Sequence, residues 1–297
     1  MLRRNTLVPW FYLLPALGLV ILFVYYPVVD NFRLSLFSWN AFSSQVSWVG
    51  LGNYQALAAD PVFWTALVNN TFYALVSVVF QVGLGLVIAG VLEETLIHRF
   101  RTFFRTVYFL PSVISLTVVG LLFQILYDPQ MGLIDQVLRA IGRPEWTHAW
   151  LGESVTAIWS IIAMSQWQSI GYITLLFIVA IQKIPGDLYE AAALDGTGRV
   201  RAFLHITVPL LREMTALALI LTISGAYMVF NEVMVTTGGG PNNASQVLGT
   251  WMYQSAFMND KMGYASAIAS VIFVITFAIA SAQLWLTRKG RAEAALG

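Results

Sequence analysis

The sequence predicts an all-α integral membrane protein with six membrane-spanning helices. Hydrophobic residues make up 58% of the 297 residues and charged residues 10%, whereas soluble domains have about 45–50% and about 25%. No soluble core could bury that much apolar surface, so lipid is the expected solvent. Six apolar stretches are also long enough to cross about 30 Å of hydrocarbon, which takes about 20 helical residues. We expect a single membrane domain over residues 1–297.

The first helix is expected at about 10–36, and the core helices occupy about 67–286. A signal peptide is the alternative for the first stretch, because Arg3 and Arg4 precede an apolar run. The run is too long for a typical signal core and no small-x-small cleavage site follows, so we expect a retained helix. The six expected helices are 10–36, 67–92, 104–126, 155–181, 210–230 and 264–286.

Lysine and arginine residues are divided unequally between the two sides of these stretches. The positive-inside rule places the richer side in the cytoplasm. Both termini and the loop at 183–211 are therefore expected in the cytoplasm. The residues expected inside are Arg3, Arg4, Arg99, Arg101, Arg105, Lys183, Arg199, Arg201, Arg212, Arg288, Lys289 and Arg291; those expected outside are Arg33, Arg139, Arg143 and Lys261.

Composition excludes several functional classes. The net charge of +1 provides no basic face for nucleic acid. The absence of cysteine removes disulfides, thiolate nucleophiles and cysteine metal sites. His98, His148 and His205 are scattered over both sides, so we expect no metal site. No catalytic pair or triad converges in one span, so we expect no enzyme.

The loop at 183–211 is more structured than a simple connection requires. Pro185 suits the entry to a helix because its φ is preset. Residues 188–194 include three alanines, and Gly196 provides a left-handed stop just beyond them. Phe203, Ile206 and Leu210 then form an apolar stripe for a second short helix. The alternative is an ordinary loop with alanines as helix filler and carboxylates as solvated charge.

The pattern Glu-Ala-Ala-x-x-Asp-Gly at 190–196, followed by Phe203, Ile206 and Pro209, closely resembles the EAA loop of permease subunits of binding-protein-dependent ABC importers. The stretches 49–54 and 237–241 resemble the carbohydrate-uptake branch, in particular the larger subunit type of the maltose and glycerol-3-phosphate importers. The resemblance covers about 10–288. One departure is Thr197-Gly198, where the family more often has alanine first.

This resemblance implies a type I ABC importer permease fold with a cytoplasmic coupling helix. Such a helix sits in a cleft of the cytoplasmic ATPase, and closure of the ATPase dimer rocks the spanning helices between inward- and outward-facing states. The resemblance further implies a second, distinct permease subunit, an external solute-binding protein and a bacterial or archaeal cytoplasmic membrane. ATP and Mg²⁺ would be bound by the ATPase, and this chain would hold no cofactor. The coupling residues by motif position are Glu190, Ala191, Ala192, Asp195 and Gly196.

Polar side chains inside a span are candidates for solute contact because they are costly in lipid. Ser165, Gln168 or Ser169, and Tyr172 fall on one face of the fourth helix. Amides and hydroxyls can bond sugar hydroxyls, and aromatic rings can stack on sugar C–H faces. The equivalent stretch of the fifth helix, with Thr222 and Ala226, is less polar. Packing between helices is the alternative role for all of these residues, and it is the expected one for Asn69, Asn70 and Gln124.

The sequence therefore predicts one subunit of an ATP-driven sugar importer. A glycerol-3-phosphate or phosphodiester importer is an alternative, although no lysine or arginine lies in the predicted cavity. A stand-alone secondary transporter or channel is a second alternative; the absence of charge inside helices two to four and six disfavours ion coupling. The segment 238–241 lacks the Gly-Lys-Ser/Thr of a phosphate loop, and we expect it to form an outer turn that contacts the binding protein.

Overall fold

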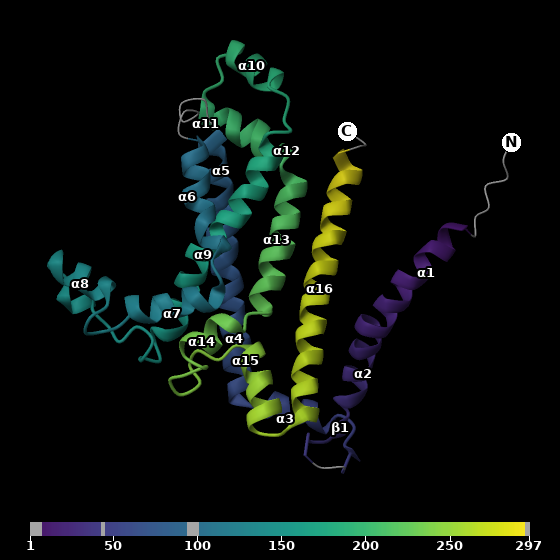
Figure 1. The fold of residues 1–297 in the computed structure, drawn as a ribbon. Coiled ribbons are helices and arrows are strands. Elements are labelled where there is room, and N and C mark those ends of the chain that lie inside the picture. The colour runs from purple at the N-terminus through teal and green to yellow at the C-terminus, as the bar shows by residue number, and fades with distance from the viewer. Residues whose placement is uncertain (1–7, 43–44, 94–100, 295–297) are drawn as a thin grey trace. The chain divides into compact units, whose positions relative to one another are not determined.

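A computed structural model describes residues 8–42, 45–93 and 101–294 of the chain (Figure 1). The chain divides into two compact units, each taken by itself below. One unit combines Met1–Asp60 with Met252–Phe273, and the other combines Pro61–Trp251 with Val274–Gly297. The expected single domain stays a prediction.

In the first unit, the expected N-terminal helix is present as α1 (Val8–Val20), η1 (Ile21–Tyr25) and α2 (Tyr26–Leu34). Its side chains from 12 to 27 are all exposed. A continuous apolar helix with no buried side of its own over this length is typical of a span that faces lipid.

The motif at 49–54 forms hydrogen bonds to the backbone at and just beyond the end of α2. The side-chain amide of Asn53 donates to the carbonyls of Ser35 and Phe37, at 2.7 and 2.9 Å. These groups would otherwise lie free beyond the last turn of α2. A short antiparallel pair, β1 (Phe37–Ser38) with β2 (Ser47–Trp48), and helix α3 (Gly52–Ala59) complete this end of the unit.

The first unit also contains the junction between η6 (Gln254–Met258) and α16 (Met262–Ala294), the sixth expected helix. The Tyr264 hydroxyl donates to Asp60 Oδ2 at 2.5 Å, and Asn31 Nδ2 donates to Ser270 Oγ at 3.0 Å. These bonds attach the start of α16 to α2 and α3.

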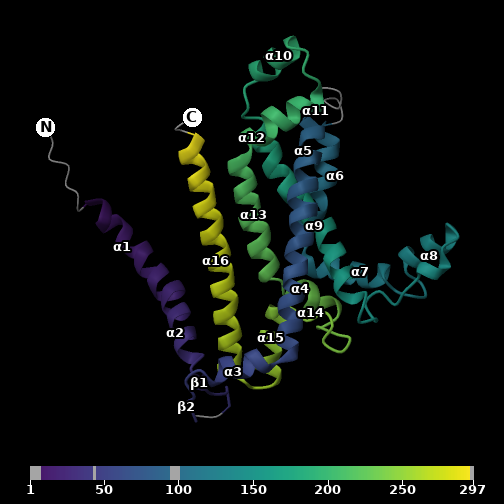
Figure 2. The same ribbon diagram turned by 180° about the vertical axis from the view of Figure 1, so that it is seen from behind.

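In the second unit, the second expected helix is one apolar helix of 33 residues, Pro61–Glu93. It comprises α4 (Pro61–Ser77), η2 (Val78–Leu84) and α5 (Gly85–Glu93). The fourth expected helix, α9 (Ala157–Ile181), is the central element of this unit and packs against α4, η2, α5, α6 and α13. Figure 2 shows α5 and α9 lying along one another. Their shared core is apolar and includes Val82, Ala89, Ile173, Phe177, Leu211 and Ala218.

The third expected helix is not continuous. Residues 104–126 fall on α6 (Arg101–Val113) and α7 (Leu116–Leu126), which meet at 96°. Pro111 has no N–H to continue the helical ladder, and Ser115 is extended at φ −55°, ψ 132°. The backbone of α6 also lies directly against α9, because a Cβ on Gly171 would overlap the Tyr108 carbonyl. A proline near the helix end and close packing on α9 thus explain the break that length and hydropathy did not predict.

The fifth expected helix is shorter than predicted. Instead of spanning 210–230, α13 covers Arg212–Tyr227 and bends by 71° from the preceding helical segment Arg199–Leu210. That segment contains α11 (Arg199–Ala202), η5 (Phe203–Thr207) and α12 (Val208–Leu210). By length and composition the described residues form four candidate spans, or six if each bent pair is one span.

The remaining elements are short. They are α8 (Leu133–Ala140), η4 (Pro144–Trp146), α10 (Asp187–Leu194), α14 (Asn231–Thr236) and α15 (Leu248–Tyr253). Among the basic residues that determine the expected orientation, Arg3, Arg4 and Arg99 lie outside the described residues, as do the side chains of Arg101, Arg288, Lys289 and Arg291.

Candidate functional site

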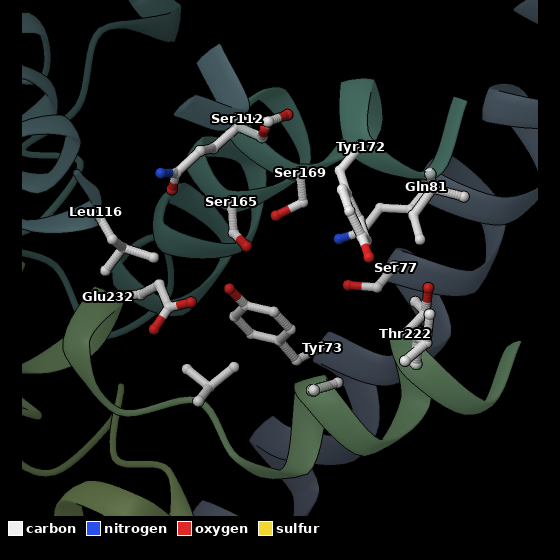
Figure 3. Close-up of a pocket in the computed structure, with 16 residues that line it drawn as sticks. Tyr73, Ser77, Gln81, Ser112, Leu116, Ser165, Ser169, Tyr172, Thr222 and Glu232 are labelled. Carbon is white, nitrogen blue, oxygen red and sulfur yellow. The ribbon is translucent and has the colours of Figure 1, made fainter. Parts of the chain in front are cut away.

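A cavity of about 340 Å³ lies inside the second unit, between α4–η2, α6–α7, α9, α13 and the start of α14 (Figure 3). Binding sites for small molecules commonly enclose about 300–1,000 Å³. The cavity is lined by Tyr73, Ser77, Gln81, Ser112, Leu116, Ser165, Gln168, Ser169, Tyr172, Ile173, Leu221, Thr222, Gly225, Ala226, Val229 and Glu232.

The structure brings together all six residues that the sequence indicated for the solute pathway. Ser165, Gln168, Ser169 and Tyr172 line the cavity from α9, and Thr222 and Ala226 line it from α13. The fold therefore places these six residues on one surface. Their contact with a solute stays a prediction.

Sequence reasoning missed a polar face on the second expected helix. Tyr73, Ser77 and Gln81 are spaced four residues apart and line the cavity from α4 and η2, as residues at i, i+4 and i+8 of a helix do. This spacing was visible in the sequence. Ser112 and Glu232 were missed for a different reason. Ser112 lies beside the unpredicted break after α6, and Glu232 follows the end of α13, which comes earlier than expected.

Several polar atoms in this lining have no hydrogen-bond partner within the described chain. They are the Tyr73 hydroxyl, Ser77 Oγ, Gln168 Oε1 and Thr222 Oγ1, and their residues are only 3%, 1%, 7% and 6% exposed. A buried polar atom without a partner costs about 1–3 kcal/mol. Such atoms around one cavity indicate that water or a polar ligand completes their hydrogen bonds.

Gln168 is held rigidly in this lining. Its side-chain Nε2 donates to the Ile114 carbonyl at 3.0 Å, and its backbone carbonyl accepts from Ser112 Oγ at 2.7 Å. Both partners lie at the break between α6 and α7. The break therefore fixes the side chain and leaves Gln168 Oε1 as an acceptor for a donor in the cavity.

Glu232 gives the cavity its one ionisable carboxyl. It lies in α14, outside the candidate spans, and its side chain points toward those of Tyr73 and Ser165 (Figure 3). Burial raises the pKa of this carboxyl above its ordinary value. None of the residues that line the cavity is lysine, arginine or histidine.

The expected coupling loop forms the helix that the sequence predicts. Helix α10 is followed by Gly196, whose φ of +74° is the left-handed stop. No residue of α10 is buried, and Leu194 is 89% exposed. Glu190, Ala191, Asp195 and Gly196 are exposed, and Ala192 is half-buried.

A side-chain hydrogen bond joins α10 to η5. The hydroxyls of Tyr189 and Thr207 are 2.7 Å apart, and Phe203 packs against Gly90 at the end of α5. A cleft of about 530 Å³ lies between these parts, with Glu190 in its lining. The predicted anchoring stripe is thus correct at Phe203 and at half-buried Ile206, but Leu210 is 52% exposed.

Of the three amides expected to join helices, Asn70 and Gln124 do so, whereas Asn69 joins a helix to a loop. Asn69 Nδ2 donates to the carbonyls of Ala244 and Gln246, both at 2.8 Å, and Gln124 Nε2 donates to those of Val235 and Thr236. Asn70 bonds Ala226 and Leu248. The loop at 237–247, with Gly238 and Gly239 at positive φ, is thereby fastened to α4; its contact with a binding protein stays a prediction.

Comparison with known proteins gives the family. A family model described as "Binding-protein-dependent transport system inner membrane component" matches residues 81–291. The "Probable ABC transporter permease protein YurN" of Bacillus subtilis is 52% identical over 99% of this chain and 100% of its own. The "Arabinooligosaccharides transport system permease protein AraP" of Halalkalibacterium halodurans is 32% identical over 96% of this chain and 89% of its own. The "Multiple sugar-binding transport system permease protein MsmF" of Streptococcus mutans is 29% identical over 94% of this chain and 95% of its own.

Solved structures agree on the fold. A chain of a bacterial ABC transporter "involved in the import of the acidic polysaccharide alginate" superimposes with a TM-score of 0.82, at 22% identity and with 95% of each chain covered. A chain of the bacterial alginate ABC transporter in complex with an alginate pentasaccharide-bound periplasmic protein gives the same TM-score at 20% identity, over 95% of this chain and 94% of its own. At such identities the match establishes the fold alone.

Proposed function

Because the chain belongs to the family of binding-protein-dependent transport system inner membrane components, we propose that it is the membrane-spanning subunit of an ATP-driven sugar importer. The observation that carries this proposal is the cavity whose lining includes buried hydroxyl and amide groups without hydrogen-bond partners in the described chain. Relatives named for arabinooligosaccharides and for multiple sugars support a saccharide as the solute. The solute passes from outside to the cytoplasm by alternating access.

The pathway residues bind the saccharide transiently. Ser165, Gln168 and Ser169 on α9, with Thr222 on α13, exchange hydrogen bonds with sugar hydroxyls. Tyr172 is 48% exposed and offers a ring face to sugar C–H groups. Ala226 is small and leaves room for the ring of the sugar.

The coupling residues transmit the energy. Helix α10 has no buried residue of its own, which suits a helix that docks into another protein. ATP-driven closure of an ATPase dimer shifts the inward–outward equilibrium only as far as its differential affinity allows. The chain itself is not an enzyme and holds no cofactor; the ATPase binds ATP and Mg²⁺.

The proposed assembly contains four kinds of component. This chain pairs with a second, different permease subunit, and an ATPase dimer docks on the cytoplasmic side. A solute-binding protein delivers the sugar from outside; the alginate ABC transporter of the same fold has been solved in complex with an alginate pentasaccharide-bound periplasmic protein. The complex lies in the cytoplasmic membrane of a bacterium or archaeon, with both termini in the cytoplasm by the positive-inside rule.

The alternatives explain fewer observations. A phosphate-bearing solute such as glycerol-3-phosphate would meet Glu232 and no basic residue in the cavity lining. A stand-alone secondary transporter could use Glu232 as an ion site, but it would leave the exposed α10 without a role.

Uptake assays test the pathway. In cells that carry the complete importer, Gln168→Ala and Tyr172→Ala should raise the KM for the transported sugar by about tenfold, because each removes a solute contact. The exposed Gln136→Ala serves as the control, and immunoblots check membrane levels. Unchanged affinity and selectivity in both variants would remove the cavity from the pathway.

A further inference from the structure

The cavity combines one acidic group with no basic group in its lining. Glu232 enters from α14, and every other lining side chain is uncharged at neutral pH. Glu232 points toward Tyr73 in the close-up (Figure 3), and that residue is a phenol, which is itself neutral in this range. Burial raises the pKa of Glu232, so the test below is made at pH 8, which favours the ionised form; once ionised, this carboxylate is the dominant fixed charge of the cavity lining.

A fixed charge in the cavity lining interacts strongly with a charged solute inside the cavity. Two unit charges about 7 Å apart interact by roughly 2 kcal/mol at an effective dielectric constant near 20, which is more than a tenfold change in occupancy. Walls of low dielectric constant also focus the field into the cavity. The free groups of the lining, namely three hydroxyls and the Gln168 Oε1 acceptor, carry no charge that would compensate.

We propose that Glu232 is a selectivity-determining residue that admits neutral or ammonium-bearing saccharides to this cavity and rejects saccharides that carry a carboxylate or phosphate. This inference rests on the proposed function and specifies its substrate class. The shared fold does not determine this property, because a solved transporter of the same fold is described as importing an acidic polysaccharide. In this chain the charge of the cavity lining determines which saccharides are admitted.

The absence of cysteine from the chain allows a direct measurement. Ser169→Cys places one thiol in the cavity lining. Two methanethiosulfonate reagents of similar size, one with a trimethylammonium group and one with a sulfonate group, compare cation and anion access. In each reaction the thiolate attacks the reagent sulfur, a mixed disulfide forms and methanesulfinate leaves. The complete importer in nanodiscs at pH 8 is used, and importer without the added cysteine gives the background.

The ratio of cationic to anionic rates, divided by the same ratio for free 2-mercaptoethanol, isolates the field of the cavity. We expect this normalised ratio to exceed one by about tenfold in Ser169→Cys. Adding Glu232→Gln should bring it close to one, and adding the exposed Glu145→Gln should leave it high. In Ser154→Cys, whose thiol lies at an exposed position in the loop before α9, adding Glu232→Gln should leave the normalised ratio unchanged.

Three results would overturn the inference. The first is a normalised ratio near one in Ser169→Cys, and the second is a high ratio that remains after Glu232→Gln. The third is no reaction of Ser169→Cys with either reagent, which would mean that the cavity is closed to solutes. These rates do not depend on which solute is transported. A negative result here therefore leaves the importer assignment standing, whereas unchanged uptake in Gln168→Ala and Tyr172→Ala removes the pathway itself.

Discussion

At the scale of single residues, Asn70 shows how one amide can join two helix ends in a membrane protein. Its side chain is fully buried. Nδ2 donates to the Ala226 carbonyl in the last turn of α13 at 2.6 Å, and Oδ1 accepts from the Leu248 N–H at the start of α15 at 2.8 Å. Helix ends leave such groups unpaired, so Asn70 satisfies one group of each.

Removal of this amide should destabilise the protein. Asn70→Ala leaves two buried backbone groups unpaired, at about 1–3 kcal/mol each, and should lower the Tm of the purified complex by about 4 °C or more. Thermal unfolding in nanodiscs measures the change. Thr65→Val on the exposed side of the same helix is the control and should shift Tm little. Equal shifts in the two variants would show that the Asn70 bonds contribute no net stability.

The roles of single residues were only partly predictable. Asn69, Asn70 and Gln124 could be assigned to packing because an amide in lipid must find a partner nearby. Glu232 could not be placed in the cavity, because its position depends on α13 ending at Tyr227 and the chain turning back as α14. That turn is set by tertiary contacts, and hydropathy does not report it.

At the scale of elements, the sequence predicts where apolar helices lie better than where they bend. The helices at Pro61–Glu93 and Ala157–Ile181 agree with expectation, since a helix satisfies the backbone hydrogen bonds of a long apolar run within the run itself. The 96° break between α6 and α7 leaves the same average hydropathy as a straight helix. Only the position of Pro111 pointed to it. The unpredicted break matters because it fixes Gln168 and brings Ser112 to the cavity.

Helix α10 carries the coupling prediction. Reversal of charge in Glu190→Lys should leave membrane insertion intact but reduce ATP-dependent uptake by at least about tenfold, because a charge contact with the ATPase becomes unfavourable. Glu145→Lys makes the same change at an exposed residue of η4 and should retain uptake. Normal uptake by Glu190→Lys would contradict the docking role.

At the scale of the whole molecule, the family assignment and the expected orientation lead to one mechanical account. The chain contains the cavity, and α10 lies beyond the ends of α5 and α9 (Figures 1 and 2). The proposed solute contacts in the cavity lining and the proposed ATPase contacts at α10 therefore lie apart in the fold. Rocking of helices, rather than chemistry within this chain, would connect them.

The orientation can be measured with the same cysteine-free background. Ser154→Cys should react with a membrane-impermeant maleimide added to spheroplasts, because the loop before α9 is expected outside. Lys183→Cys should react only after permeabilisation, because 183–211 is expected in the cytoplasm. Both positions are exposed. The opposite labelling pattern would invert the topology and place α10 out of reach of any ATPase.

The most direct test of the account is to purify the chain from its native membrane with an affinity tag and to identify what accompanies it by quantitative mass spectrometry. We predict two copies of a nucleotide-binding ATPase subunit and one copy of a second permease for each copy of this chain, with ATP hydrolysis in the purified sample. A stable chain that purifies alone and transports its solute without an ATPase would contradict the account.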